Sequence, residues 1–271
     1  MLMDNVNTTS QIPDLQTLFE RRTQNISSIF SSYRTLYQIY MAALDTVKAN
    51  ENTIIALTKA KESVGREQSK ISNQLYSQGF ILLVASAEAL LKDVFDRLLT
   101  ENFTKINLSS SLNFSAKDIQ KALSDWNPVN NQIRDLHTSL GRLVEKKMHD
   151  SKNPIEKINF QNVLSMRTIF KSYLDLEISD SETTRRIHKY WQQRHLLMHS
   201  NGIIDERYIN NVKVVDLLTK NEVVGAEVII TKKDYDKAVG DFTLLFGELT
   251  KLILEAKLNL DIINATDQVD F

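Results

Sequence analysis

The most informative feature of this 271-residue chain is how little it contains of several residue types. It has no cysteine, 7 glycines and 3 prolines. The absence of cysteine excludes disulfide bonds, cysteine-based zinc sites and catalysis by a thiol. Glycine and proline interrupt helices, so their scarcity favours long helices over a β architecture rich in turns. We therefore predict an all-α fold.

The chain also lacks a long apolar run and an excess of charge of either sign. Its longest apolar run, residues 80–87, is far shorter than the roughly 20 residues that span a bilayer. The first residues lack the basic and apolar regions of a secretory signal. The formal net charge of −1 gives no general attraction to nucleic acid, so RNA binding would depend on a local basic patch. We expect a soluble, cytoplasmic protein that does not bind membranes.

Apolar residues recur at helical spacing over most of the chain, with breaks expected around residues 49–52 and at Gly65. The β-branched runs within residues 203–230 predict a small hairpin or a pair of extended segments before the last helix. We divide the chain into an N-terminal helical extension (1–66), a helical domain (67–260) and a tail (261–271). The expected helices span residues 14–47, a shorter piece up to 63, 67–102, 116–125, 130–148, 154–173, 183–200 and 231–258.

The first helix carries four aromatic residues on one face: Phe30, Tyr33, Tyr37 and Tyr40. Such a row could serve as a platform on which nucleobases stack. Aromatic residues at helical spacing are far more often part of a core or of an interface, and we assign them to packing.

The segment 181–208 has the features of a helix that ends beside reactive groups. An Asn201-Gly202 pair supplies a left-handed stop. Just before it lie Arg194, His195 and His199, a permanent cation and two groups that titrate near neutrality. Ordinary helix geometry places His188 on the same face, about 16 Å along the axis from His199 and therefore too far for a shared metal ion. We predict no metal site and no cofactor.

The residues Arg194, His195 and His199, followed by the turn SNGIID, resemble the signature of the HEPN family. That signature is an arginine, a polar residue and a histidine after four to six intervening positions. The resemblance implies a HEPN-like helical bundle and a homodimer with a composite active site. It also implies metal-independent cleavage of RNA that leaves a 2′,3′-cyclic phosphate and a 5′-hydroxyl. Such proteins often belong to toxin–antitoxin or antiphage defence systems, which implies an antitoxin or another defence partner.

These residue types suit that chemistry. His199 can act as general acid and base, Arg194 can hold the phosphate oxygens, and His195 can position the phosphate or assist His199. Asn201 belongs to the turn that ends the helix. Glu88, within an apolar stretch, either forms a structural ion pair or approaches Arg194 or a catalytic histidine and tunes it.

Three further cations, Arg185, Arg186 and Lys189, could form the basic approach for RNA, although a solvated charged face is the more common role of such residues. Arg194 and His199 lie about 140° apart around an ideal helix, so their side chains do not simply point together. Either the helix loosens before Gly202, or two copies of it bring the groups together. The alternative function is a noncatalytic HEPN-like protein that dimerises or binds a nucleotide or a partner.

Overall fold

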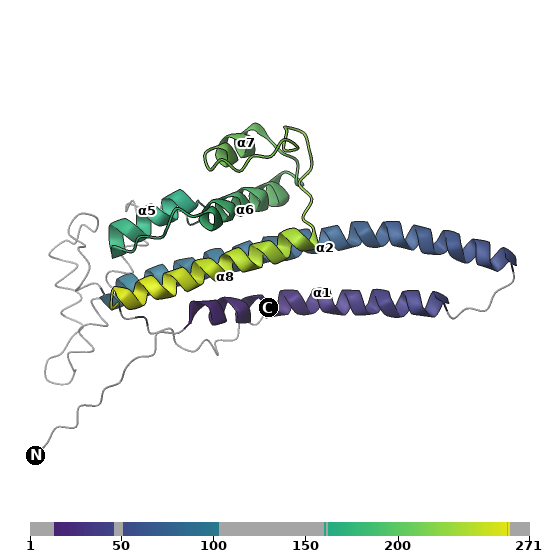
Figure 1. Cartoon of the computed structure of the whole chain (residues 1–271), viewed down its shortest axis with the longest axis horizontal. Helices are drawn as coiled ribbons and strands as arrows, with labels where there is room; N and C mark the ends of the chain where they lie inside the picture. The colour runs from purple at the N-terminus through teal and green to yellow at the C-terminus, as the bar shows by residue number, and fades with distance from the viewer. Residues whose placement is uncertain (1–13, 46–50, 103–159, 161, 259, 261–271) are drawn as a thin grey trace, which may run out of the picture. The chain divides into compact units, whose positions relative to one another are not determined.

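The computed structural model describes residues 14–45, 51–102, 160, 162–258 and 260, which are mostly helical (Figure 1). These residues contain no strand, so the predicted all-α class is confirmed. Expected helices 116–125 and 130–148, and residues 154–159 of the expected helix 154–173, lie outside the described residues. The helices of the described part are α1 (Leu15–Asp45), α2 (Glu51–Asn102), α5 (Val163–Leu174), α6 (Glu182–His199), α7 (Glu206–Lys213) and α8 (Lys232–Glu255).

The long helix α2 passes through Gly65 without a break, so the expected interruption at this glycine is wrong. A glycine inside a helix costs only about 1 kcal/mol relative to alanine. Packing along the rest of a 52-residue helix can offset such a cost. None of the described helices offers an apolar stretch of the length needed to cross a membrane.

The chain groups into two compact units. We call the first the α5 unit, which comprises Met1–Leu18, Glu88–Ser181 and Leu245–Phe271. The second, the α6 unit, comprises Phe19–Ala87 and Glu182–Leu244. The helices α1, α2 and α8 contribute residues to both units.

The α5 unit is built on aromatic packing between α5 and the end of α2. The ring of Phe95 in α2 lies 5.5 Å from Phe160 and 5.5 Å from Phe170, in edge-to-face arrangements. Such arrangements add to the hydrophobic gain of burying the rings. The segment after α5 is tied to α8, since the Ser179 N–H donates to the Glu248 carboxylate at 2.7 Å.

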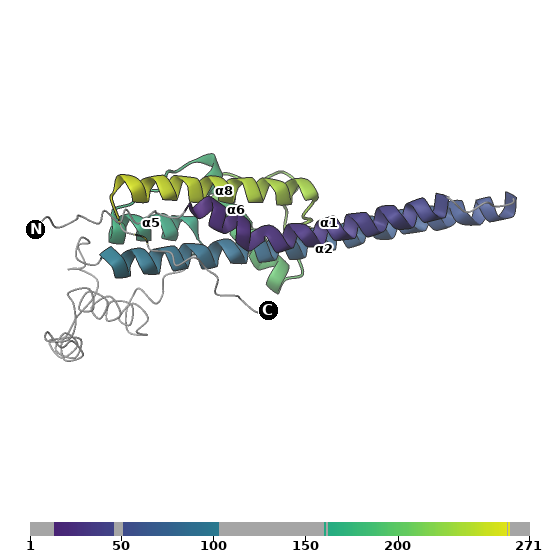
Figure 2. The ribbon, with the colours of Figure 1, turned by 90° about the horizontal axis from the view of Figure 1, so that it is seen from below.

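In the α6 unit, α1 runs alongside α2 in both views (Figures 1 and 2). The two helices meet closely at Gly79, where an added Cβ would lie 2.2 Å from the ring of Phe30. The buried ring of Phe242 in α8 joins the elements, because it lies 5.8 Å from Phe19 of α1 and 6.2 Å from Tyr190 of α6. The helix α6, which carries Arg194, His195 and His199, is thereby part of a packed core.

Local signals in the sequence set the start of α8. Thr231 and Asp234 form a capping box, in which the Thr231 N–H donates to the Asp234 carboxylate at 3.0 Å and the Asp234 N–H donates to Thr231 Oγ1 at 3.3 Å. The hairpin expected before this helix does not form within the described residues. Its first part is the helix α7, and a single antiparallel bridge joins Ile203 to Glu227. Asp205 caps α7 by accepting the Tyr208 N–H at 2.7 Å, a local signal that outweighs the β-branched residues that follow.

Candidate functional site

The helix α6 ends where the sequence predicts. Asn201 and Gly202 have φ values of 50° and 78°, so both occupy the left-handed region. The Gly202 N–H donates to the Leu196 carbonyl at 3.0 Å as a second donor beside the Ser200 N–H, which closes the end of the helix. A Cβ at Gly202 would lie 3.3 Å from the Val228 carbonyl oxygen. Both backbone conformation and space therefore require glycine here, and Asn201 serves the turn as predicted.

His195 and His199 lie one turn apart on α6 and pack against each other. Their ring centroids are 4.7 Å apart, with the ring planes inclined by 49°. His199 is exposed, whereas His195 and Arg194 are half-buried. The last turn of α6 therefore presents one accessible imidazole backed by a second one.

The surroundings of His195 are rich in positive charge. Burial is the largest cause of its lowered pKa, and the charges of Arg207, His199 and Arg194 lower it further, while Asp205 partly opposes them. These residues come from the end of α6 and the start of α7. A neutral His195 can accept a proton or a hydrogen bond, and the neighbouring cations make this end of α6 locally positive on a chain whose net charge is near zero.

The helix does not loosen before its end. The Ser200 N–H donates to the Leu196 carbonyl at 2.8 Å in the regular α-helical pattern. Arg194 and His199 therefore keep the angular separation of about 140° that a straight helix imposes. Of the two ways to bring these groups together, the one that changes the helix is wrong, and pairing of two chains stays a prediction.

Arg186 is held inside the α6 unit by acidic partners. Its guanidinium donates from Nε to Asp241 Oδ2 at 2.8 Å and from Nη2 to Asp241 Oδ1 at 2.6 Å, and it also contacts Glu182. Asp241 is 4% exposed and accepts a further hydrogen bond from the Tyr190 hydroxyl at 2.6 Å. Burial, followed by the hydrogen bond to Asp241, raises the pKa of Tyr190. These contacts join α6 to α8 and give Arg186 a structural role, while its contact with RNA stays a prediction.

Lys189 is used in a similar way. Its ammonium donates to the Leu217 carbonyl at 2.9 Å and to the Glu222 carboxylate at 2.7 Å. Glu222 also accepts the Tyr208 hydroxyl at 2.6 Å. Burial acts to raise the pKa of Glu222, but the hydrogen bonds from Lys189 and Tyr208 outweigh it and the pKa is lowered. Lys189 therefore fastens the loop after α7 to α6, and of the three cations predicted to approach RNA only Arg185 is exposed.

Two other candidate groups are placed as follows. Glu88 is half-buried and lies in the α5 unit, so its approach to Arg194 or a histidine stays a prediction. His188 is 2% exposed, with Nε2 3.1 Å from the Asn211 carbonyl of α7. Its Nδ1 has no hydrogen-bond partner among the described residues. Burial lowers its pKa, which favours the neutral ring with Nε2 as donor.

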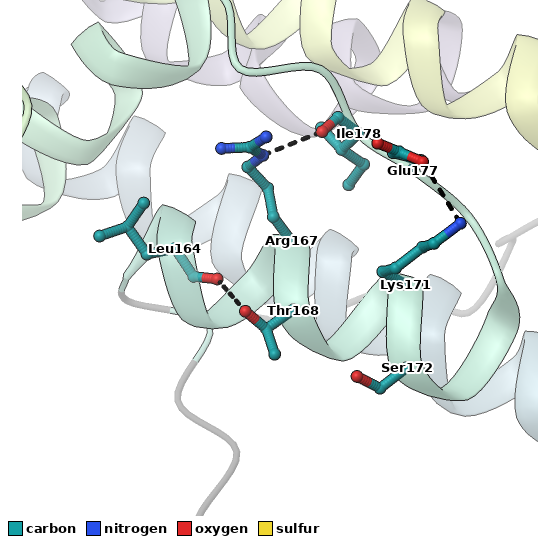
Figure 3. Close-up of a pocket in the computed structure, with 7 residues that line it drawn as sticks. All are labelled: Leu164, Arg167, Thr168, Lys171, Ser172, Glu177 and Ile178. Carbon is teal, nitrogen blue, oxygen red and sulfur yellow. Dashed lines mark hydrogen bonds and ion pairs between the residues drawn. The ribbon is translucent and has the colours of Figure 1, made fainter.

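The α5 unit has a hollow of its own, with a volume of about 370 Å³ (Figure 3). Its cations are already engaged. Arg167 donates from Nε to the Ile178 carbonyl at 2.9 Å, and Lys171 lies 2.9 Å from Asp175 and 3.3 Å from Glu177. These interactions hold the segment after α5 against that helix.

Within the described residues, no group of three or more histidine, aspartate or glutamate side chains is arranged to hold a metal ion. Comparisons with protein-family models, with curated proteins and with solved structures found no match to this chain. The features of this chain that bear on function are therefore the end of α6 and its resemblance to the HEPN signature.

Proposed function

We propose that this chain is a metal-independent endoribonuclease of the HEPN type, which cleaves RNA through a composite site in a homodimer. The observation that carries the proposal is the charged end of α6, where the exposed His199 packs at 4.7 Å on His195 among Arg194 and Arg207. The HEPN resemblance favours a toxin–antitoxin or antiphage defence context, with an antitoxin or another defence protein as partner.

The reaction needs only a base and a cation. An imidazole takes the proton of a ribose 2′-hydroxyl while that oxygen attacks the adjacent phosphorus. His199 suits this role because it is more exposed than His195. The bond from phosphorus to the 5′-oxygen breaks, and the leaving oxygen takes a proton from an acid of the site. The products are a 2′,3′-cyclic phosphate and a 5′-hydroxyl. Arg194 binds the nonbridging oxygens as their negative charge grows.

A second chain supplies the convergence that one α6 lacks. Arg194 and His199 of one helix are separated by about 140° around the axis, so a phosphate between two copies of α6 can meet Arg194 of one copy and His199 of the other. Two apolar side chains beside the site favour such pairing. Met198 is 51% exposed and Ile203 is 43% exposed. Covering these apolar side chains with a second chain would be favourable.

The direct test is cleavage of a panel of single-stranded RNAs in EDTA. We expect the wild type to cut RNA but not DNA of the same sequence, and to leave a 5′-hydroxyl that a polynucleotide kinase can label. His199→Ala and Arg194→Ala should each lower the rate by roughly 100-fold or more. Arg21→Ala is the matched control, because Arg21 is an exposed arginine of the same unit on α1. Cleavage that persists in both motif variants would refute the proposal.

Mixing the two inactive variants tests the composite site. If each site takes Arg194 from one chain and His199 from the other, mixed dimers regain one intact site, and random pairing restores roughly a quarter of the wild-type activity. A site within one chain would regain nothing.

The exposed Met198 and Ile203 also favour the second candidate, a noncatalytic protein that dimerises or binds a nucleotide or a partner through this surface. Met198→Glu separates the two. In the noncatalytic case the wild type is inactive on every RNA, yet Met198→Glu still converts a dimer to a monomer in light scattering. In the nuclease case the same substitution lowers both the mass and the cleavage rate.

A further inference from the structure

The α6 unit also contains a hollow, and none of the residues named at the end of α6 lines it. It has a volume of about 430 Å³, which is within the range of small-molecule sites. Its walls come from the consecutive helices α1 and α2 and from Lys232 at the start of α8. The lining residues used below are Phe30, Tyr33, Arg34, Tyr37, Tyr76 and Lys232.

The apolar wall of this hollow is a fixed set of aromatic rings. Phe30 of α1 lies 4.6 Å from Tyr76 of α2 and 4.9 Å from Tyr235 of α8, the latter edge to face. Gly79 allows Phe30 to sit this close to α2, because any Cβ there would overlap the ring. Rings held on several sides do not need to be ordered when a ligand binds, which lowers the cost of binding.

The aromatic residues of α1 are only partly used in packing. Tyr33 and Tyr37 are half-buried and line the hollow, while Leu36 and Tyr40 are 66% and 49% exposed. The second half of this face is therefore not part of a core within the described residues, and its assignment to an interface stays a prediction. Burial is the largest cause of a raised pKa at Tyr33, so its phenol is neutral and can donate a hydrogen bond.

Two cations stand at the hollow. Arg34 lies on an exposed turn of α1, and it has no ion-pair or hydrogen-bond partner among the described residues. Lys232 pairs with Asp236, and the hydrogen bond with that carboxylate raises its pKa, while the charge of Arg34 acts in the opposite direction. Both cations line the hollow, so an anion bound there would meet two positive charges.

Uncommitted hydrogen-bonding groups complete the lining. Gln68 and Ser72 of α2 face the hollow, and within the part of the chain that the structure describes neither side chain has a hydrogen-bond partner. An amide and a hydroxyl beside aromatic rings suit the edge of a planar, polar ring.

We propose that this hollow binds a small aromatic anion, whose planar ring packs on the tyrosines and whose phosphate or carboxylate group is held by Arg34 and Lys232. The proposal does not depend on the nuclease activity, since it uses none of the residues at the end of α6. A nucleoside monophosphate and an aromatic carboxylic acid both have this chemistry.

Titration of the full chain by calorimetry tests the proposal and separates the two sources. The probes are AMP, adenosine, ribose 5-phosphate and indole-3-acetate, at up to millimolar concentration. We expect AMP or indole-3-acetate to bind roughly tenfold more tightly than adenosine, which lacks the anion, or ribose 5-phosphate, which lacks the ring. Binding of AMP alone assigns a phosphate, and binding of indole-3-acetate alone assigns a carboxylate. Equal, or absent, binding of all four probes would overturn the proposal.

Variants locate the site. Arg34→Gln should weaken the binding of the aromatic anion roughly tenfold and leave that of adenosine unchanged. Arg21→Gln, an exposed arginine on the same helix that does not line the hollow, should change neither. Equal affinities in the two variants would show that the anion binds elsewhere. If Tyr37→Ala instead converts a dimer to a monomer in light scattering, a second copy of the chain occupies the hollow and the ligand proposal fails.

Discussion

Removal of the Asp241 carboxylate should destabilise the α6 unit more than removal of any exposed carboxylate on α8. Asp241 has a side chain 5% exposed and faces the Arg186 guanidinium, which is 18% exposed. Asp241→Ala leaves a cation and the Tyr190 hydroxyl without the acceptor that both now share. Breaking a buried ion pair from one side costs about 3–5 kcal/mol. Arg186 keeps Glu182 and Thr183 as neighbours, so we expect the lower end, about 3 kcal/mol.

Two further variants provide comparisons for this loss of unfolding free energy. Tyr190→Phe removes one hydrogen bond to a charged group and should cost about 1.5 kcal/mol. Asp236→Ala is the matched control, because Asp236 is also a carboxylate on α8 but pairs with Lys232 where both side chains are more than half exposed. Exposed pairs of this kind contribute about 0–1 kcal/mol. The expected order of destabilisation is therefore Asp241→Ala, then Tyr190→Phe, then Asp236→Ala.

Urea unfolding followed by tryptophan fluorescence measures these differences in unfolding free energy within the α6 unit. Trp191 is 2% exposed and lies in the same unit as Arg186 and Asp241. A Trp126→Phe background leaves it as the only tryptophan, since the chain has 2. The double variant Arg186→Met with Asp241→Leu should regain much of the lost stability, because apolar residues can replace a buried pair. If Asp241→Ala and Asp236→Ala unfold within about 1 kcal/mol of each other, the pair does not join α6 to α8 as described.

Three other outcomes follow from the same contacts. Burial lowers the pKa of His188, so its neutral form contributes stability that is complete above the unfolded pKa of about 6.5 and is lost as the pH falls through the lower folded pKa. Between neutral pH and pH 5 the urea midpoint should therefore fall less in His188→Gln than in the wild type. An equal fall in both proteins would refute this. Gly79→Val should cost about 1–3 kcal/mol through overlap with Phe30, whereas Gly65→Val, with no atom within 4 Å of an added Cβ, should not destabilise. Gly202→Val should destabilise by at least about 1 kcal/mol at its positive φ and slow RNA cleavage, and an unchanged melting temperature would contradict the account of the turn.

The resemblance to the HEPN signature could be read from the sequence because its residues are close together in the chain. So could the end of α6 at Asn201-Gly202, which depends on the local preference for left-handed backbone. Sequence reasoning did not find the hollow between α1 and α2. The helical spacing of Tyr33 and Tyr37 predicts packing, and only the fold places the half-buried Gln68 and Ser72 of α2 in the same hollow.

The sequence by itself determined the all-α class, the extent of α6 and the capping box at Thr231 and Asp234, because each depends on residues within a few positions of one another. Only the tertiary structure decided the role of the cations on α6. Arg186 pairs with a carboxylate 55 positions away, and Lys189 with one 33 positions away. A charge on the surface of a helix is compatible with solvent, RNA or an ion pair, and which of these it meets depends on what the fold brings opposite it.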